Sequence, residues 1–332
     1  MHLVLGLPGL LAAGESLPEL PGLARLLHAA GAPAAAQDSV PHALAACFGV
    51  TRAGDWPLAA LRLRAQGCDP AGDWWLAAHP VTLVAGRDDV RVAGAVADLS
   101  ADDAASLVGR LNAHFATDGL RFVAATPRHW FLGSPRPYAM TTRPLACALG
   151  APLFELLPRG PDARIWRRWE SEIEMLLHDH PVNVRREAQA RAAVNGLWLC
   201  DGGALPAPPR PMPGRVTFAH DDAVRALAAH AGEAHADVPG SLAAARAAAA
   251  AAPELVAVVA ADADPAAIEA NWTLPAWQAL AAGVLSGVTL VADGRGGALR
   301  WEAFRPGLAA RVALRFAAPR LRPLLPAPAP SA

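Results

Sequence analysis

The positions of apolar and polar residues predict a chain that mixes helices with strands. Apolar residues between Trp166 and Leu177 recur at steps of three and four, which predicts a helix with one apolar face. Pro181 disfavours helical geometry in the residue before it, so we expect this helix to end near His180.

A short helix and a strand are expected directly after that proline. Asn183 is placed to cap the helix, which contains Arg185 and Arg186. Residues 194–199 predict a short apolar strand, and the Asp-Gly-Gly sequence at 201–203 predicts a tight turn.

Continuous apolar runs elsewhere predict the buried strands of a parallel sheet. They cover residues 2–5, 255–259 and 288–292. Between residues 74 and 203 the pattern instead predicts hairpins and helices, one of them capped by Ser100. We therefore expect an α/β protein with a second region that mixes helices and hairpins.

Composition narrows the classes of function. The 332 residues suffice for one or two domains, and the net charge of −1 argues against nucleic acid as a partner. The four cysteines lack metal-ligand spacing, so neither a zinc site nor a disulfide framework is indicated. No apolar run approaches the roughly 20 residues that span a bilayer, and no signal peptide is recognised. We expect a cytoplasmic protein with no cofactor and no membrane partner.

Asn183, Arg186 and Asn195 are candidate ligand-binding residues. Arginine offers a rigid fork of donors for phosphate or carboxylate, and asparagine adds a donor and an acceptor. In the structural alternative, Asn183 caps a helix, Arg186 pairs with a Glu of the preceding helix, and Asn195 satisfies a turn. Spacing alone favours the structural alternative.

A family resemblance enters at this segment. The sequence HPVN-x-x-R at 180–186, followed by VNGLWLCDGG at 194–203, resembles a motif of the archaeal-type, cofactor-independent phosphoglycerate mutases. It is closer still to a bacterial group, the RpfE-type regulatory proteins. RHWFL at 128–132 and LLPRG at 156–160 resemble further segments of the mutases.

This resemblance implies an alkaline-phosphatase-like, three-layer α/β core with an inserted α+β domain. The core would comprise residues 1–73 and 204–320, and the insertion residues 74–203. Residues 321–332, rich in Pro and Ala, would form a disordered tail.

The inserted domain of the mutases helps to grip the phosphate and carboxylate of the substrate. Carried over motif by motif, the ligand-binding residues would be Arg128, Asn183, Arg186 and Asn195.

The metal centre of the mutases is not preserved in this chain. They carry an acid after the first strand, where this chain has Leu5-Gly6-Leu7, and no His accompanies Asp262 or Asp293 as it does in the mutases. The serine nearest after the first strand is Ser16. Asp201 stands where the mutases have Gly, and its carboxylate would repel an anionic substrate.

Three functions remain open. The leading hypothesis is a catalytically degenerate mutase relative, a pseudoenzyme with a regulatory or small-ligand-binding role and a small anionic ligand. The second is a metal-dependent phosphomutase or phosphatase that uses Mn or Zn at Asp262, Asp293 and His178 or His180. The third is a structural protein that binds a protein partner. The missing ligands speak against an enzyme.

Overall fold

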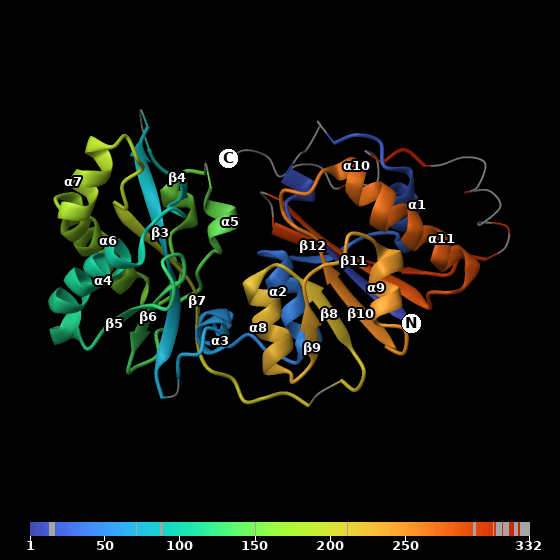
Figure 1. Ribbon diagram of the computed structural model, residues 1–332, viewed down its shortest axis with the longest axis horizontal. Coiled ribbons are helices and arrows are strands. Elements are labelled where there is room, and N and C mark those ends of the chain that lie inside the picture. Colours follow the sequence, from blue (N-terminus) through green and yellow to red (C-terminus); the bar gives the residue numbers. More distant parts are fainter. Residues whose placement is uncertain are drawn as a thin grey trace. The chain divides into compact units, whose positions relative to one another are not determined.

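The computed structural model describes residues 1–12, 17–70, 72–86, 89–149, 151–210, 212–294 and 297–307, together with 309, 314, 319–321 and 325 (Figure 1). The chain divides into two compact units. Unit 1 comprises Met1–Val50 and Pro208–Ala332, and unit 2 comprises Thr51–Ala207. Unit 2 is therefore one continuous segment inserted into the chain of unit 1.

Unit 1 is built on a seven-stranded sheet in the order β2-β12-β11-β1-β10-β8-β9. Strand β1 is parallel to β10 and β11, β8 is parallel to β10 and β9, and β12 is antiparallel to β11 and β2. The strands are β1 (His2–Leu7), β2 (Ala34–Gln37), β8 (Val216–Ala219), β9 (Ala234–Ala236), β10 (Glu254–Val258), β11 (Gly287–Gly294) and β12 (Gly297–Phe304).

Helices cover both faces of this sheet. Leu3, Leu5 and Leu7 of β1 belong to a core shared with helices of one face. Gly6, which points to the other face, would place a Cβ 2.9 Å from Val40 at the start of a helix there. Figure 1 shows α1, α10 and α11 on one side and α2 and α8 on the other. The helices are α1 (Pro21–Ala30), α2 (Val40–Ala45), η2 (Ala46–Phe48), α8 (Asp222–His230), α9 (Leu242–Ala248), α10 (Pro265–Ile268), the π-helical turn η5 (Glu269–Thr273) and α11 (Leu274–Ala282).

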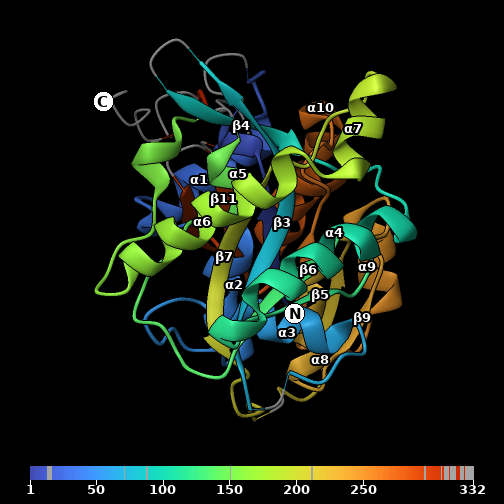
Figure 2. The same ribbon diagram turned by 90° about the vertical axis from the view of Figure 1, so that its left-hand side faces the viewer.

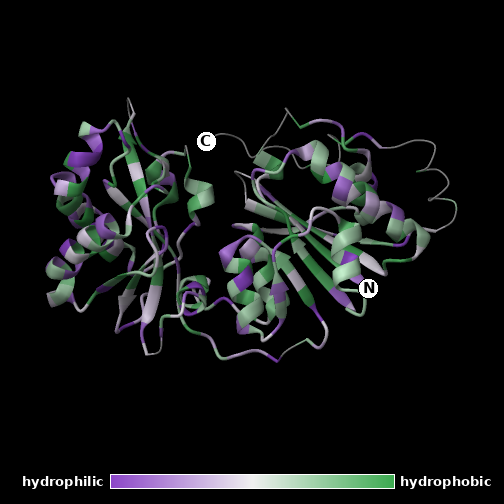
Figure 3. Ribbon diagram, viewed as in Figure 1, coloured by the Kyte–Doolittle hydropathy of each residue, from purple (hydrophilic) through white to green (hydrophobic). Residues whose placement is uncertain are grey.

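The predicted α/β class and three-layer core are confirmed in unit 1. The apolar runs predicted as strands lie in β1, β10 and β11, where most residues are buried. Figure 3 shows hydrophobic residues concentrated in these strands. They are buried on both faces because helices cover both sides of a parallel sheet.

Unit 2 is an antiparallel sheet packed with helices. The long strand β3 pairs with β7 along one edge and with β4 and β6 along the other, and β6 pairs with β5. The strands are β3 (Trp74–Ala85), β4 (Val90–Ala95), β5 (Arg121–Ala124), β6 (Trp130–Ser134) and β7 (Gly196–Ala204). This arrangement fits the inserted α+β domain that we expected.

Two hydrophobic clusters lie on the faces of the sheet of unit 2. Side chains of α4 and α6 contribute to one, and side chains of α3, α5 and η4 contribute to the other. Figure 2 views this sheet from the side of α4, α6 and α7. The helices are α3 (Leu58–Ala65), α4 (Ala101–Phe115), η3 (Ala116–Asp118), α5 (Leu145–Ala148), η4 (Leu153–Leu156), α6 (Ala163–His178) and α7 (Pro181–Ala188).

The division of the chain differs from the boundaries drawn on the sequence. Residues 51–73 were expected in the core, but they lie with unit 2, because Ala59, Ala60 and Leu63 of α3 pack in a cluster with side chains of β3 and β7. The expected tail at 321–332 falls almost wholly outside the described residues.

Two local predictions in unit 2 were wrong. His180, not Asn183, is the N-cap of α7, because its Nδ1 accepts the Val182 N–H at 3.2 Å. Residues 201–203 do not turn but continue β7 to Ala204. Asp201 has a φ of 63°, and the register with β3 shifts there, so the strand contains a bulge.

The glycines beside this bulge allow close packing. A Cβ on Gly202 would lie 2.5 Å from the ring of Trp74, and one on Gly203 would lie 2.5 Å from the Cβ of Pro57.

Within the described residues, no helix is long and apolar enough to cross a bilayer.

Candidate functional site

Asn183 and Asn195 use their side-chain amides to hold backbone. Asn183 is buried in α7; its Oδ1 accepts the Val194 N–H at 2.9 Å, and its Nδ2 donates to the carbonyls of Val194 at 2.8 Å and Leu177 at 2.7 Å. Asn195 accepts the Leu83 N–H at 2.6 Å and donates to the Leu83 carbonyl at 2.8 Å. Both asparagines thus fix the segment that leads into β7.

Arg186 and Arg128 converge on one loop, residues 96–100, between β4 and α4. The Nε of Arg186 donates to the Ala192 carbonyl at 2.7 Å, and its Nη2 is paired with Asp98. The Nε of Arg128 donates to the carbonyl of Ala97 at 2.9 Å. Arg186 therefore pairs with this loop, and not with a Glu of α6 as the structural alternative supposed.

Arg191 joins the same loop, although the sequence did not single it out. Its Nη2 lies 2.8 Å from Oδ2 of Asp98 and donates to the Asp98 carbonyl at 2.6 Å. Hydrogen bonds from Arg186 and Arg191 lower the pKa of the Asp98 carboxyl. The structure thus brings together Arg128 and Arg186 of the predicted set and adds Arg191 and Asp98.

A second polar group lies at the carboxyl ends of the strands of unit 1. Asp293 near the end of β11 accepts the Gly9 N–H at 2.6 Å through Oδ1 and the Val40 N–H at 2.8 Å through Oδ2. Burial raises the pKa of this carboxyl, while the two backbone hydrogen bonds lower it. Asp293 therefore connects the loop after β1 to the start of α2.

Ser39 and His42 lie beside Asp293, and the sequence reasoning missed them. The Ser39 Oγ lies 3.1 Å from Nδ1 of His42, and both side chains are buried. No sequence motif marks this pair, because a nucleophile and its base are recognised by their geometry and not by their spacing in the chain.

The other predicted metal candidates are separated or already used. Asp262 is exposed, and its neighbour Asp264 caps α10 by accepting the Ala266 N–H at 3.3 Å. His178 is exposed on α6, and His180 caps α7. Ser16 lies outside the described residues.

The described residues show no cluster of metal-binding side chains. In the parts of the chain that the structure describes, no three His, Cys, Asp or Glu side chains lie close enough to share an ion. A metal shell needs several such ligands converging on one point.

The bulge in β7 places a buried acid next to another. Asp201 is buried, and its charge raises the pKa of Asp55, although burial is the larger cause. Asp55 accepts hydrogen bonds from the backbone of Thr142 at 3.0 Å and of Gly202 at 3.2 Å. Asp201 therefore lies within a buried polar cluster that ties three segments of unit 2 together.

Similarity to known proteins is partial. No protein-family model matches the chain. A 2,3-bisphosphoglycerate-independent phosphoglycerate mutase of Methanothrix thermoacetophila is 36% identical over 98 residues, which are 28% of this chain and 25% of that protein. The mutase of the same name from Methanosarcina mazei is 26% identical over 110 residues, 32% of this chain and 28% of that protein. The matches thus span little more than a quarter of these relatives.

Two solved structures match over most of the chain at low identity. A cofactor-independent phosphoglycerate mutase from Thermoplasma acidophilum is 16% identical, with a TM-score of 0.42, and the match covers 92% of this chain and 90% of that one. A protein from Pyrococcus horikoshii is 14% identical, with a TM-score of 0.46, and the match covers 94% and 92%.

Proposed function

We propose that this chain is a catalytically degenerate relative of the cofactor-independent phosphoglycerate mutases, with an alkaline-phosphatase-like core. In this proposal it belongs with the RpfE-type regulatory proteins and acts by binding a small anionic ligand. The sequence similarity to archaeal mutases supports the ancestry.

The observation that carries the loss of catalysis is the bonding of Asp293. Each of its carboxylate oxygens accepts a backbone N–H, one from Gly9 and one from Val40. Each oxygen uses one of its two lone pairs to hold backbone, so we take the role of Asp293 to be structural. Pro8 and Gly9, which directly follow β1, have no side chain that can ligate a metal.

The arginines of the 96–100 loop support the binding role. Arg128, Arg186 and Arg191 supply charged donors for phosphate or carboxylate, whereas Asn183 and Asn195 position the segment that precedes β7. We therefore assign ligand recognition to the arginines and assign the asparagines to the fold.

The test combines metal analysis with an activity assay on the purified protein. We expect no stoichiometric Mn or Zn by mass spectrometry, and no conversion of 3-phosphoglycerate in a coupled mutase assay with added Mn. Asp293→Asn should lower the melting temperature without changing the metal content. Stoichiometric metal together with turnover that Asp293→Asn abolishes would overturn the proposal.

A second candidate function rests on the pair of Ser39 and His42. A serine hydroxyl 3.1 Å from an imidazole nitrogen can give up its proton to that base as it attacks an ester. The acid Asp293 lies close enough for the charge of His42 to lower its pKa. This arrangement favours a hydrolase or phosphatase over a purely structural protein.

Hydrolysis of p-nitrophenyl phosphate separates this candidate from the pseudoenzyme. A hydrolase that uses Ser39 would lose activity in Ser39→Ala. Ser241→Ala is the matched control, because Ser241 also begins a helix and caps α9 through the Ala244 N–H at 3.3 Å. Activity in neither the native protein nor the control would exclude this candidate.

A further inference from the structure

Three arginines from other segments contact the loop between β4 and α4. Arg186 and Arg191 both contact the carboxylate of Asp98, and Arg128 holds the carbonyl of Ala97. Two guanidinium groups thus share one carboxylate, and a third contacts a backbone carbonyl of the same loop. The remaining positive charge attracts oxyanions.

Several donors of these arginines have no acceptor among the described residues. The Nη1 of Arg186 is buried without a hydrogen-bond partner, and this side chain is only 2% exposed. Arg128 is exposed. Among the described residues, its guanidinium donates through Nε to the Ala97 carbonyl, and both terminal nitrogens remain for another acceptor. The terminal nitrogens of the exposed Arg128 are therefore the donors that a ligand can reach.

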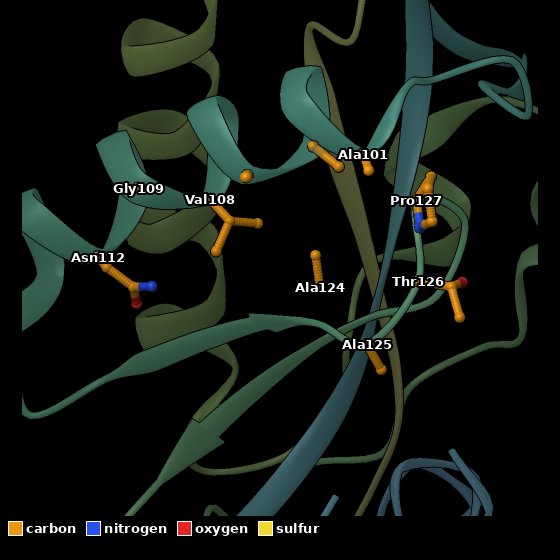
Figure 4. Close-up of a pocket in the computed structure, with 10 residues that line it drawn as sticks. Ala101, Val108, Gly109, Asn112, Ala124, Ala125, Thr126 and Pro127 are labelled. Carbon is orange, nitrogen blue, oxygen red and sulfur yellow. The ribbon is translucent and has the colours of Figure 1, made fainter. Parts of the chain in front are cut away.

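A pocket of about 410 Å³ adjoins this loop. Small residues of α4, such as Ala101 and Ala105, form one wall, and residues 124–127 between β5 and β6 form the other. Figure 4 shows Ala101 and Pro127 at one end of the pocket and Asn112 at the opposite end. Arg128 follows Pro127 in the chain and contacts Ala97, so Arg128 lies at the end where α4 begins; Arg191 contacts Asp98 of the same loop.

The two ends of the pocket differ in chemistry. At the far end Asn112 commits its amide to Phe122, whose N–H it accepts at 2.7 Å and whose carbonyl it contacts at 2.9 Å. The long wall of α4 presents alanines, Val108 and Gly109. The volume lies in the range of about 300–1,000 Å³ that small-molecule sites occupy.

We propose that this pocket binds a small organic acid, with its apolar body along α4 and its phosphate or carboxylate at Arg128 and Arg191. Asp98 is the internal competitor: its side chain is 55% exposed, so an external oxyanion can displace it from Arg191. This inference rests on the proposed ligand-binding role and names the chemistry of the ligand.

Calorimetric titration with three probes tests both parts of the site. Phenyl phosphate has both a phosphate head group and an apolar body. Inorganic phosphate has only the head group, and phenol has only the apolar body. We expect phenyl phosphate to bind about tenfold more tightly than inorganic phosphate at low salt, since burying an aromatic ring favours binding. Equal affinities of the two phosphates would exclude the apolar part of the site.

Three substitutions at the arginine end test the head group. Arg128→Gln and Arg191→Gln should each lower the affinity for phenyl phosphate and for inorganic phosphate by about tenfold, as expected when a charged hydrogen bond is lost. Asp98→Asn keeps the shape of the side chain but removes the competing charge. It should raise the affinity for phenyl phosphate and for inorganic phosphate by roughly fivefold. Unchanged affinity in Arg128→Gln and Asp98→Asn would overturn the proposal.

Filling the pocket tests the body of the ligand. Ala105→Trp should remove the advantage of phenyl phosphate and leave the affinity for inorganic phosphate unchanged. Ala113→Trp is the matched control, because Ala113 is exposed on α4 but does not line the pocket. If the control removes the advantage equally, the assigned pocket is wrong.

The mutase assay keeps the two proposals apart. Turnover of 3-phosphoglycerate that is insensitive to Arg128→Gln would defeat the pseudoenzyme proposal. The titrations with phenyl phosphate and inorganic phosphate would then decide whether this pocket binds a ligand. Binding of 3-phosphoglycerate that survives Arg128→Gln and Arg191→Gln, without turnover, would support a ligand-binding pseudoenzyme and defeat this site.

Discussion

At the scale of single residues, three asparagines replace missing backbone partners. The primary amide of Asn112 bonds both the N–H and the carbonyl of Phe122, as Asn183 does with Val194 and Asn195 with Leu83. A side-chain amide offers the same donor and acceptor as a peptide group. Each asparagine therefore acts as one more unit of backbone beside the segment that it contacts.

Asn183→Ala should destabilise unit 2 strongly. It removes three hydrogen bonds and leaves the N–H and carbonyl of Val194 without these partners, whereas the carbonyl of Leu177 still accepts the His180 N–H at 3.2 Å. We expect a loss of about 2–4 kcal/mol in the free energy of unfolding, measured by urea denaturation, since each buried unpaired group costs about 1–3 kcal/mol. Val184→Ala is the control, because Val184 is exposed on the same helix. A loss below about 1 kcal/mol would contradict the backbone role.

Glu170 should make stability depend on pH. Burial, and then the charge of Glu174, raise its pKa from 4.5 to about 8. The folded state therefore binds a proton that the unfolded state has released between these values, and stability falls as pH rises through this window. The slope contributed by one group is at most about 1.4 kcal/mol per pH unit.

Unfolding free energies measured from pH 5 to pH 8 check this expectation. Glu170→Gln should flatten the decline, because glutamine cannot ionise. Glu172→Gln is the control: Glu172 already pairs with Arg168 at 3.1 Å and with His114 at 2.9 Å. An identical decline in native protein and Glu170→Gln would show that the carboxyl of Glu170 titrates normally.

At the scale of elements, α7 ends in a strained conformation. Ala190, two residues beyond its last residue, has a φ of 55°, the left-handed region that glycine adopts without steric cost. Its N–H still bonds to the Glu187 carbonyl at 2.9 Å, as in a helix that closes with a left-handed residue.

Ala190→Gly should therefore stabilise the protein. Relief of the strain at a left-handed alanine contributes about 1 kcal/mol, partly offset by the greater entropy of glycine in the unfolded chain. Ala188→Gly, in the last turn of α7, should instead destabilise by about 0.5–1 kcal/mol. Chemical denaturation of both variants measures the difference, and effects of the same sign would argue against strain at Ala190.

Elements with strong periodicity were predictable from the sequence, and their ends were not. The apolar stripe of α6 and the Ser100 cap of α4 follow from local patterns, and both are confirmed. The cap of α7 was assigned to Asn183 because asparagine is a common cap, but a tertiary contact with Val194 uses its amide. Local propensity cannot anticipate such competition.

The candidate site was less predictable than the fold, because its contacts are long-range. Val40 and Asp293 meet across 253 positions, and Arg186 and Asp98 across 88. The motif predicted which segment is specialised but not what each side chain binds. No motif marks Arg191, because its partner Asp98 lies before α4, far from α7 in the sequence.

At the scale of the whole molecule, the chain enters and leaves unit 2 at one place. Asp55 accepts the Gly202 N–H at 3.2 Å, and Trp74 pairs with Ala204. Bonded ends of this kind let a continuous segment fold on its own, because excising it breaks no internal strand pairing. Unit 2 also has its own hydrophobic clusters.

The excised segment 51–207 should therefore fold alone, whereas the shorter segment 74–203 should not fold as well. The shorter segment lacks Asp55 and all of α3, so it exposes Ala77 and Cys200 and leaves the Gly202 N–H unpaired. We expect cooperative urea unfolding for segment 51–207 and a clearly lower midpoint for segment 74–203. Equal stability of the two segments would support residues 74–203, the boundary predicted from the sequence. It would mean that α3 contributes little to the fold of unit 2.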